Sequence, residues 1–430
     1  MKSVAQLVEK LRSNETLRIV FDAIRKDGPL TRAKLSERVS VSKPTCYGLI
    51  DELVKTGAVS EEIVGSGGRR LSPTIRSAQD LCSSIGLDIH MEGIHALMMD
   101  SSLRIRAETF LPNTFDPDRL ICTDSRDALI ARIEEALHRV RVAVASEEAP
   151  PAAVCVSASG TIDDREGVYI SNPYIPSLHD IPVRSMIRRI LPVPVFLARG
   201  SNLVTLSEIR HLGPEAAPNL ICLSLKRGVG LGIVTGGRLY TGDTGNAGRL
   251  SATRMAGWIP GSADTPKPPL ADPTVDSLLG LSAILAPLRE SPDVLRDEAR
   301  GQAGHGIAGP TDGGIPEGKA DWELRGLLDR YEEGDCRVAD GLRTYADRLA
   351  AVIADLSLIL DVRQVLLAGR YVYCGPRFIE DIRGLVAGRL PRESRQSLDV
   401  RKGSLGLRAY TWGAAYMAQE LLFYGGGEAT

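Results

Sequence analysis

The sequence predicts an α/β protein in two parts: a winged helix-turn-helix domain over residues 1–80 and a larger, duplicated α/β body over residues 81–430. Two observations lead to this prediction. Three short amphipathic helices separated by tight turns occupy residues 17–57, which is the helix-turn-helix pattern. Buried strands and amphipathic helices then follow one another in a similar order twice, which indicates an internal duplication.

The composition is that of an ordinary globular chain, with 430 residues, 43% apolar and 25% charged. The net charge of -2 is unevenly spread, because residues 1–80 carry 14 Lys and Arg against 10 Asp and Glu. Seven cysteines stand singly, without metal-binding or disulfide spacing, which suits core thiols in a reducing compartment. No apolar stretch is long enough for a signal peptide or a membrane span. We therefore expect a cytoplasmic protein without a membrane partner.

The three helices of the first domain have recognisable limits. The first has an apolar stripe at i, i+3, i+4 and i+7, formed by Leu17, Val20, Phe21 and Ile24, and ends at the "KDGP" sequence of residues 26–29. Thr31 is placed to cap the second helix and Ser42 the third, which Gly57 ends.

A wing is predicted after the third helix, with a strand over 58–64, a hairpin tip at 65–68 and a returning strand over 69–75. In such a module the third helix enters the DNA major groove and a wing arginine contacts the minor groove or phosphate. We expect double-stranded DNA as the partner, with contacts from Thr31, Arg32, Ser42, Lys43, Thr45, Tyr47, Arg69 and Arg70. The alternative is a protein-interaction module whose wing arginines are only solvated turn charges.

The body is expected to form two lobes, one from about 81–195 with the C-terminal helix and one from 196–405. Residues 83–110 alternate like a β-meander, and strands are predicted at 151–160, 195–198, 219–242 and 364–369. Residues 256–275 and 297–320 have loop composition. The helix over 405–423 is apolar on most sides, so it is either lobe core or a dimer contact.

The order of "GGRRLSP", "IGLDIH", "SASGTID", "VFLARGSNLVTLSE", "GVGLGIVTGGRLYTGDTGNAGRL" and "QVLLAGR" resembles the ROK family of repressors, open reading frames and kinases. The resemblance covers nearly the whole chain. It implies an actin-like, sugar-kinase-like pair of α/β lobes around a cleft. Members are sugar kinases or, when a winged helix precedes the body, sugar-responsive repressors.

Departures from the family's kinase pattern predict a body without catalytic activity. Matching places Arg199 and Gly200 on the Asn-Asp pair whose Asp is the kinase base, and glycine has no proton acceptor. The zinc-binding sequence that begins Gly-Glu-Ile-Gly-His is replaced by residues 248–252 and a proline-rich segment, so neither a zinc ion nor another cofactor is expected. The phosphate-binding strand end, Asp-x-Gly in the kinases, is Asp88-Ile89-His90 here.

The resemblance places four candidate effector residues at the cleft, namely Gly160, Arg199, Asn202 and Arg249. Because two guanidinium groups suit a carboxylate or phosphate, we expect a sugar or an anionic sugar derivative as effector. The arginines would otherwise pair with internal carboxylates such as Glu208 or Asp243 in a cleft that binds nothing. Gly228, Gly230 and Gly232 suit close packing better than ligand contact, and His90 and His95 are expected to be core or surface residues and not ligands.

The leading hypothesis is a sequence-specific transcription regulator, a repressor that works as a homodimer or homotetramer. The first alternative is an ATP-dependent sugar kinase that uses Asp163 or Asp164 as its base. The second is a DNA-binding dimer whose body no longer responds to any effector.

Overall fold

The computed structural model describes residues 2–62, 72–78, 81–116, 119–143, 150–213, 216–254, 274–286, 318–395 and 398–425. The N-terminal domain, called the head below, confirms the expected helices as α2 (Glu15–Asp27), α3 (Arg32–Arg38) and α4 (Lys43–Lys55). Thr31 Oγ1 accepts from Lys34 N at 3.3 Å and Ser42 Oγ from Thr45 N at 3.4 Å, so both predicted caps are present. A small sheet of order β1-β3-β2 completes the head, from β1 (Leu30–Thr31), β2 (Val59–Glu62) and β3 (Thr74–Ser77).

A further helix, α1 (Lys2–Ser13), precedes the three expected ones. No helix was expected there from the sequence. A signal was present, because Val4, Leu7, Val8 and Leu11 stand at i, i+3, i+4 and i+7, and three of them are buried. This helix packs against the C-terminal end of the chain, so the head is joined to the body by more than its linker.

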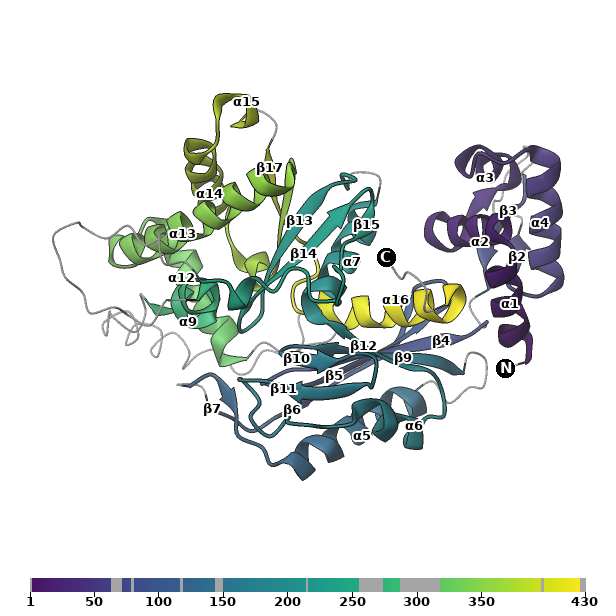
Figure 1. Ribbon diagram of the computed structural model, residues 1–430, viewed down its shortest axis with the longest axis horizontal. Coiled ribbons are helices and arrows are strands. Elements are labelled where there is room, and N and C mark those ends of the chain that lie inside the picture. The colour runs from purple at the N-terminus through teal and green to yellow at the C-terminus, as the bar shows by residue number, and fades with distance from the viewer. Residues whose placement is uncertain are drawn as a thin grey trace.

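The first lobe is built on a five-stranded sheet of order β12-β9-β4-β5-β6. Strand β12 runs parallel to β9, so residues 195–199 complete this sheet and do not begin the second lobe as expected. Helices α5 and α6 cover its outer face (Figure 1). The elements are β4 (Ser83–Ile89), β5 (Gly93–Asp100), β6 (Ile105–Pro112), β7 (Phe115–Asp116), β8 (Ile121–Cys122), α5 (Arg126–Ala143), β9 (Pro151–Ala158), β10 (Thr161–Asp163), β11 (Val168–Ser171), α6 (Val183–Ile190) and β12 (Val195–Arg199).

The second lobe repeats this arrangement with a sheet of order β15-β14-β13-β16-β17. In both sheets the first strand pairs antiparallel with the second and parallel with the fourth, which confirms the duplication. The elements are β13 (Leu220–Leu225), β14 (Val229–Thr235), β15 (Arg238–Leu239), η2 (Leu250–Ala252), α8 (Val275–Leu279), α9 (Leu281–Ile284), α12 (Lys319–Glu333), α13 (Cys336–Leu360), β16 (Gln364–Gly369), η3 (Arg370–Tyr373), α14 (Pro376–Arg389), α15 (Arg392–Arg395) and β17 (Asp399–Lys402). The predicted loop segments lie almost wholly outside the described residues.

Two helices, α7 (Gly200–Leu212) and α16 (Arg408–Tyr424), form a layer between the sheets (Figure 1). The backbones approach closely: a Cβ on Gly86 of β4 would lie 2.0 Å from the Thr411 carbonyl oxygen, and one on Gly413 would lie 2.1 Å from that of Leu203. The C-terminal helix is therefore lobe core, which explains why it is apolar on most sides. No helix in the described parts of the chain has the length and apolarity to cross a bilayer.

Candidate functional site

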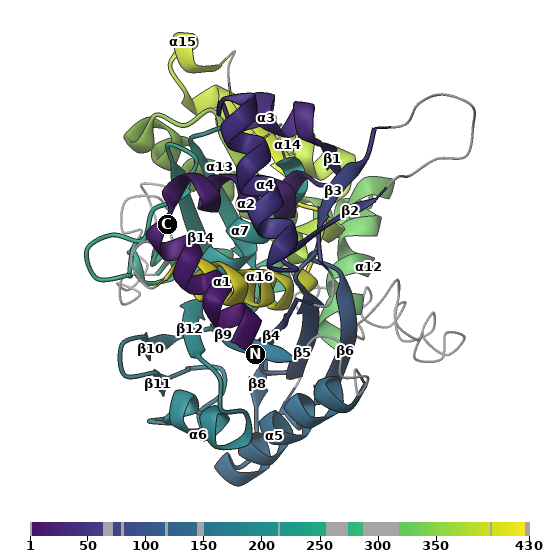
Figure 2. The same cartoon turned by 90° about the vertical axis from the view of Figure 1, so that its right-hand side faces the viewer.

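The exposed start of α4 lies on the side of the head that faces away from the body (Figures 1 and 2). Ser42, Lys43 and Thr45 are exposed there and Tyr47 is half-buried, whereas Cys46, on the opposite face of the helix, is fully buried. The helix therefore presents polar side chains and its positive dipole end to solvent. This is the arrangement that a groove-reading helix requires.

Arg32 is engaged within the head. Its Nη2 lies 2.9 Å from Glu61 Oε2 and its Nη1 lies 2.7 Å from Asp51 Oδ1, so it joins α3 to α4 and β2. The hydrogen bond to Glu61 has the largest effect on the pKa of Arg32 and raises it above its usual value, although burial acts in the opposite direction. Its predicted contact with DNA would have to compete with these two carboxylates. Arg69 and Arg70, the predicted wing contacts, lie outside the described residues.

A cavity of about 360 Å³ lies between the lobes, at the ends of strands from both sheets. Gly160, Arg199 and Arg249, three of the four predicted effector residues, line it. Asn202 instead lines a neighbouring cavity, which shares Arg199 with the first. The described residues show no group of three or more His, Cys, Asp or Glu suited to a metal.

A side chain at position 200, where the family resemblance places the kinase base, would be crowded by a neighbouring ring. A Cβ on Gly200 would lie 3.0 Å from Cδ1 and 3.1 Å from Cε1 of Tyr410, on the first turn of α16. Tyr410 itself lines the cavity. A side chain at position 200 would therefore lie in tight contact with the tyrosine ring.

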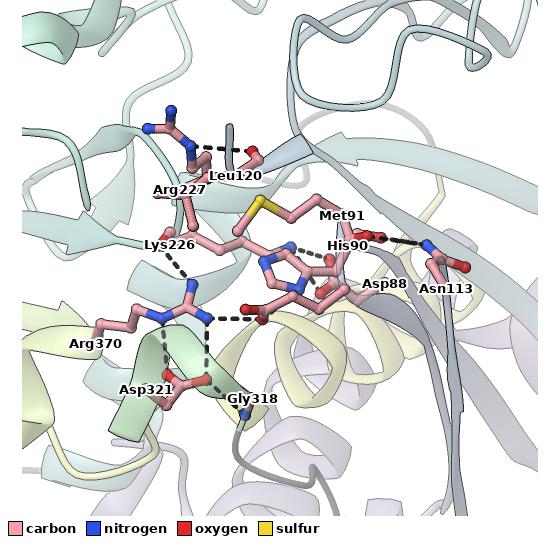
Figure 3. A network of polar contacts seen from close by, with 11 residues as sticks. Asp88, His90, Met91, Asn113, Leu120, Lys226, Arg227, Gly318, Asp321 and Arg370 are labelled. Atoms are coloured by element: carbon pink, nitrogen blue, oxygen red, sulfur yellow. Dashed lines mark hydrogen bonds and ion pairs between the residues drawn. The ribbon is translucent and has the colours of Figure 1, made fainter. Parts of the chain in front are cut away.

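Asp88 and Lys226 form a buried ion pair across the junction of the lobes (Figure 3). Lys226 Nζ donates to both carboxylate oxygens of Asp88 at 2.7 Å. Burial lowers the pKa of Lys226, and the charge of Asp88 opposes that shift. Asp88 lies near the end of the strand that the resemblance assigns to ATP phosphate, and both of its carboxylate oxygens are engaged by Lys226.

A second buried ion pair joins the lobes beside the first. Arg370 Nη2 lies 2.7 Å from Glu92 Oε2 in the first lobe, and Arg370 Nε lies 2.8 Å from Asp321 Oδ1 in the second. Burial raises the pKa of Glu92, against the lowering effect of Arg370. His90 is buried next to this network, and burial together with the charges of Lys226 and Arg370 holds its pKa well below 6.5. The network holds the lobes together through groups of the protein itself.

Arg199 bonds to main-chain oxygens instead of a carboxylate. Its Nη1 donates to the carbonyls of Asn246 at 3.0 Å and Ala247 at 2.8 Å. Burial and the nearby charge of Arg249 lower the pKa of Arg199 to about 10. Glu208, one suggested internal partner, accepts instead from Ser404 N and Leu405 N at 3.0 and 3.1 Å. Arg199 therefore does not pair with Glu208, one of the two carboxylates that the alternative interpretation suggested.

The head packs against the C-terminal end of α16. Phe423 packs edge-on against Phe21 of α2, with ring centroids 5.4 Å apart. Arg25 of α2 has a fully buried side chain, pairs with Glu420 and lies over the Phe423 ring. One helix therefore contacts the cavity through Tyr410 and the head through Phe423.

Several residues at the cavity could not be identified from the sequence. Asp276 of α8 accepts from Val229 N at 2.9 Å and from the Tyr174 hydroxyl, yet it follows a segment of loop composition. Tyr410 lies on a helix whose sequence indicates only that it is apolar. The predicted packing role of the glycines is confirmed for Gly232, whose Cβ would lie 1.8 Å from Thr205 Oγ1, and His95 is a core residue bonded to Glu108.

Comparisons with known proteins agree with this architecture. Residues 84–266 match the ROK family, and residues 13–60 match winged helix-turn-helix DNA-binding domains. A xylose repressor of Caldicellulosiruptor bescii is 24% identical over 239 residues, which are 55% of this chain and 58% of the relative. The chain thus spans little more than half the length of that curated relative.

Two solved structures show the same fold. A ROK family transcriptional regulator, described as a homologue of the E. coli Mlc protein, superposes with a TM-score of 0.67 at 18% identity, covering 98% of this chain and 97% of the other. A ROK family glucokinase from Streptomyces griseus, in complex with glucose and AMPPNP, superposes with a TM-score of 0.60 at 22% identity, covering 79% of this chain and 99% of the other.

Proposed function

The chain carries a ROK family domain behind a winged helix-turn-helix domain, and on this basis we propose that it is a sequence-specific, DNA-binding transcription regulator, a repressor. The observation that carries the proposal is the joining of an exposed polar α4 to a sugar-kinase-like body in which Gly200 and Tyr410 occupy the place of the catalytic base. Relatives named as repressors support the assignment.

The DNA-binding role is assigned to the head. Ser42, Lys43, Thr45 and Tyr47 lie on the outward side of α4, from which they would reach base edges and phosphates. Thr31 fixes the start of α3, and Arg32 holds α3 against α4 and β2. The wing arginines, Arg69 and Arg70, would contact the minor groove or phosphate. A homodimer would set the spacing of two such heads on a two-fold related operator.

The body would bind a sugar-type effector without phosphorylating it. The glycine at position 200 cannot accept a proton, and Lys226 engages both carboxylate oxygens of Asp88, on the strand that the resemblance assigns to ATP phosphate. Ligand in the cavity would act on Tyr410, and α16 would carry the displacement to the head at Phe423. Tyr410 and Phe423 lie 13 positions apart in the sequence, which corresponds to about 20 Å along a helix.

The test is selection of bound duplexes from a random DNA library with the full chain at stated salt, followed by an ADP-release assay over a panel of sugars. We expect one enriched sequence family and no sugar-dependent ADP release. Gly200→Asp should also give none, because Tyr410 crowds the new carboxylate. Failure to enrich any sequence would contradict the proposal.

The alternative function is a sugar kinase that uses Asp163 or Asp164. Asp163 Oδ1 accepts from the main-chain nitrogens of Arg165 and Glu166 at 3.0 Å each, so it stabilises the turn between β10 and β11. Asp164 lines the neighbouring cavity and is absent from the lining of the main one. Sugar-dependent ADP release that disappears in Asp163→Asn or Asp164→Asn would favour this alternative.

A further inference from the structure

The cavity between the lobes has an excess of positive charge. Among the described residues, its lining includes Arg199, Lys226, Arg227 and Arg249 but a single carboxylate, Asp276. Lys226 is neutralised by Asp88 outside the lining, and Asp276 is already engaged by Val229 N and Tyr174. Three guanidinium groups thus face a cavity with one occupied carboxylate.

Two of these guanidinium groups, those of Arg199 and Arg249, lack an anion. Arg199 is largely buried and its hydrogen bonds go to main-chain carbonyls, which leave its charge uncompensated. Arg249 is exposed on the cavity side of η2, and no ion pair is found for it among the described residues. Burial lowers the pKa of Arg199, and the charge of Arg249 lowers it further. Such a pair is unfavourable without an anion between or beside its members.

The main chain adds to the positive electrostatic potential at the cavity. Arg199 is the N-cap residue of α7 and gives no side-chain cap, so the positive end of a 13-residue helix lies at the cavity wall, where Gly200 and Ser201 line it. Asn202, whose buried Oδ1 has no hydrogen-bond partner in the described structure, lines the neighbouring cavity and is not part of this site.

The rest of the lining suits a polyhydroxylated molecule. Residues with side-chain hydroxyls line the cavity from both lobes, namely Ser159, Thr161, Ser201, Ser224, Ser251 and Thr274. The volume of about 360 Å³ is at the small end of ligand sites and matches one sugar ring with a substituent.

We propose that the cavity binds a polyhydroxylated anion, a sugar acid or a sugar phosphate, whose carboxylate or phosphate group is held between Arg199 and Arg249 at the N-terminus of α7. The regulatory meaning of this site rests on the proposed function, but binding itself does not. Guanidinium groups form paired hydrogen bonds with either oxyanion, so both ligand sources share one recognition chemistry.

The experiment is isothermal titration calorimetry on the full chain without DNA. The probes are matched sets: glucose, gluconate and glucose 6-phosphate, then xylose and xylonate, with inorganic phosphate alone. We expect at least one sugar anion to bind ten-fold or more tightly than its neutral counterpart. The carboxylate and phosphate arms identify which oxyanion is preferred.

The decisive variant is Arg249→Gln, because Arg249 is exposed and its side chain has no hydrogen bond or ion pair within the described parts of the chain, so the variant should fold. It should bind the preferred anion at least ten-fold more weakly and leave neutral-sugar binding unchanged. Arg199→Gln should have a larger effect, although it also releases the carbonyls of Asn246 and Ala247. Arg188→Gln, an exposed arginine of α6 outside the cavity, is the matched control.

Three outcomes would overturn the inference: neutral sugars binding as tightly as their anions, unchanged anion binding by Arg249→Gln, or no sugar anion binding at millimolar concentration. Because no DNA is present, any of these would leave the DNA-binding proposal standing. Conversely, if the chain binds the anion but selects no duplex, the proposed anion site stands and the proposed DNA-binding function fails.

Discussion

At the scale of single residues, a buried ion pair lies where the two lobes of this protein meet. Asp88 and Lys226 neutralise each other at 2.7 Å inside the junction, and each would be costly to bury alone. In a kinase the same region must admit and release a nucleotide, so fixed opposite charges there favour a closed body.

Removing one partner of this pair should be more harmful than removing both. Lys226→Met leaves the Asp88 carboxylate buried and unpaired, which should lower the free energy of unfolding by about 3–5 kcal/mol. Asp88→Asn combined with Lys226→Met should recover a substantial part of that loss. Urea unfolding of the three chains measures the difference. Equal losses in the single and double variants would show that the pair is not mutually dependent.

His90 should make stability sensitive to mild acid. Burial, Lys226 and Arg370 depress its pKa well below the unfolded value of 6.5, so the unfolded chain takes up a proton that the folded chain refuses. The contribution of His90 to the free energy of unfolding should therefore be fully present above pH 6.5, and the free energy of unfolding should fall as the pH drops below that value. Glu92, whose pKa is raised by burial, acts in the opposite direction.

His90→Gln isolates the histidine contribution. Thermal unfolding between pH 7.5 and pH 5 should show a smaller loss of Tm for this variant than for the wild type, as both retain Glu92. If the Tm of both proteins falls equally between pH 7.5 and pH 5, His90 does not contribute to the acid sensitivity.

At the scale of elements, α16 is the part of the molecule that connects the cavity with the head. It is held between β4 and α7 at two glycine contacts, which leave little freedom for it to bend or slide. One end lies at the cavity and the other in the apolar core of the head, which includes Phe423. A displacement of Tyr410 would therefore be transmitted along α16 to the head rather than absorbed near the cavity.

Truncating the side chain through which α16 meets the head should release the head. Phe423→Ala removes a fully buried ring from the core that it shares with Phe21 and should cost about 3–5 kcal/mol. Hydrogen exchange should accelerate in α1 and α2. Phe378→Ala, equally buried in α14, is the control and should destabilise the second lobe while leaving exchange in the head unchanged. Identical exchange patterns would contradict a separate interface between α16 and the head.

Local patterns in the sequence were sufficient for most elements and insufficient for the contacts between them. Helices α2 to α4 and their caps follow from periodicity and from Thr31 and Ser42, which are local signals. The interface between α16 and the head does not, because Arg25 resembles a solvated charge at a helix end until Glu420, almost 400 residues later, is brought beside it. The partners of Lys226 were equally hidden, since the pairing depends on how two lobes close.

The whole molecule is expected to read DNA as a symmetric pair. If two bodies associate about a two-fold axis, two heads fixed by their α16 helices will face successive major grooves. Selected duplexes should then contain inverted half-sites whose centres are about 10–10.5 base pairs, or a multiple of that, apart. Sequencing of the selected pool checks this. A single unrepeated half-site would exclude the two-fold arrangement.

The most direct test of the account is fluorescence anisotropy with the selected duplex at about 0.15 M salt. Combined Lys43→Ala, Thr45→Ala and Tyr47→Ala should weaken binding about 100-fold or more, because each interaction with a base or phosphate contributes about 1–3 kcal/mol. Arg188→Ala with Arg189→Ala, on the exposed side of α6, should bind like the wild type. If the triple variant binds as tightly as the wild type, α4 does not read DNA and the central claim is wrong.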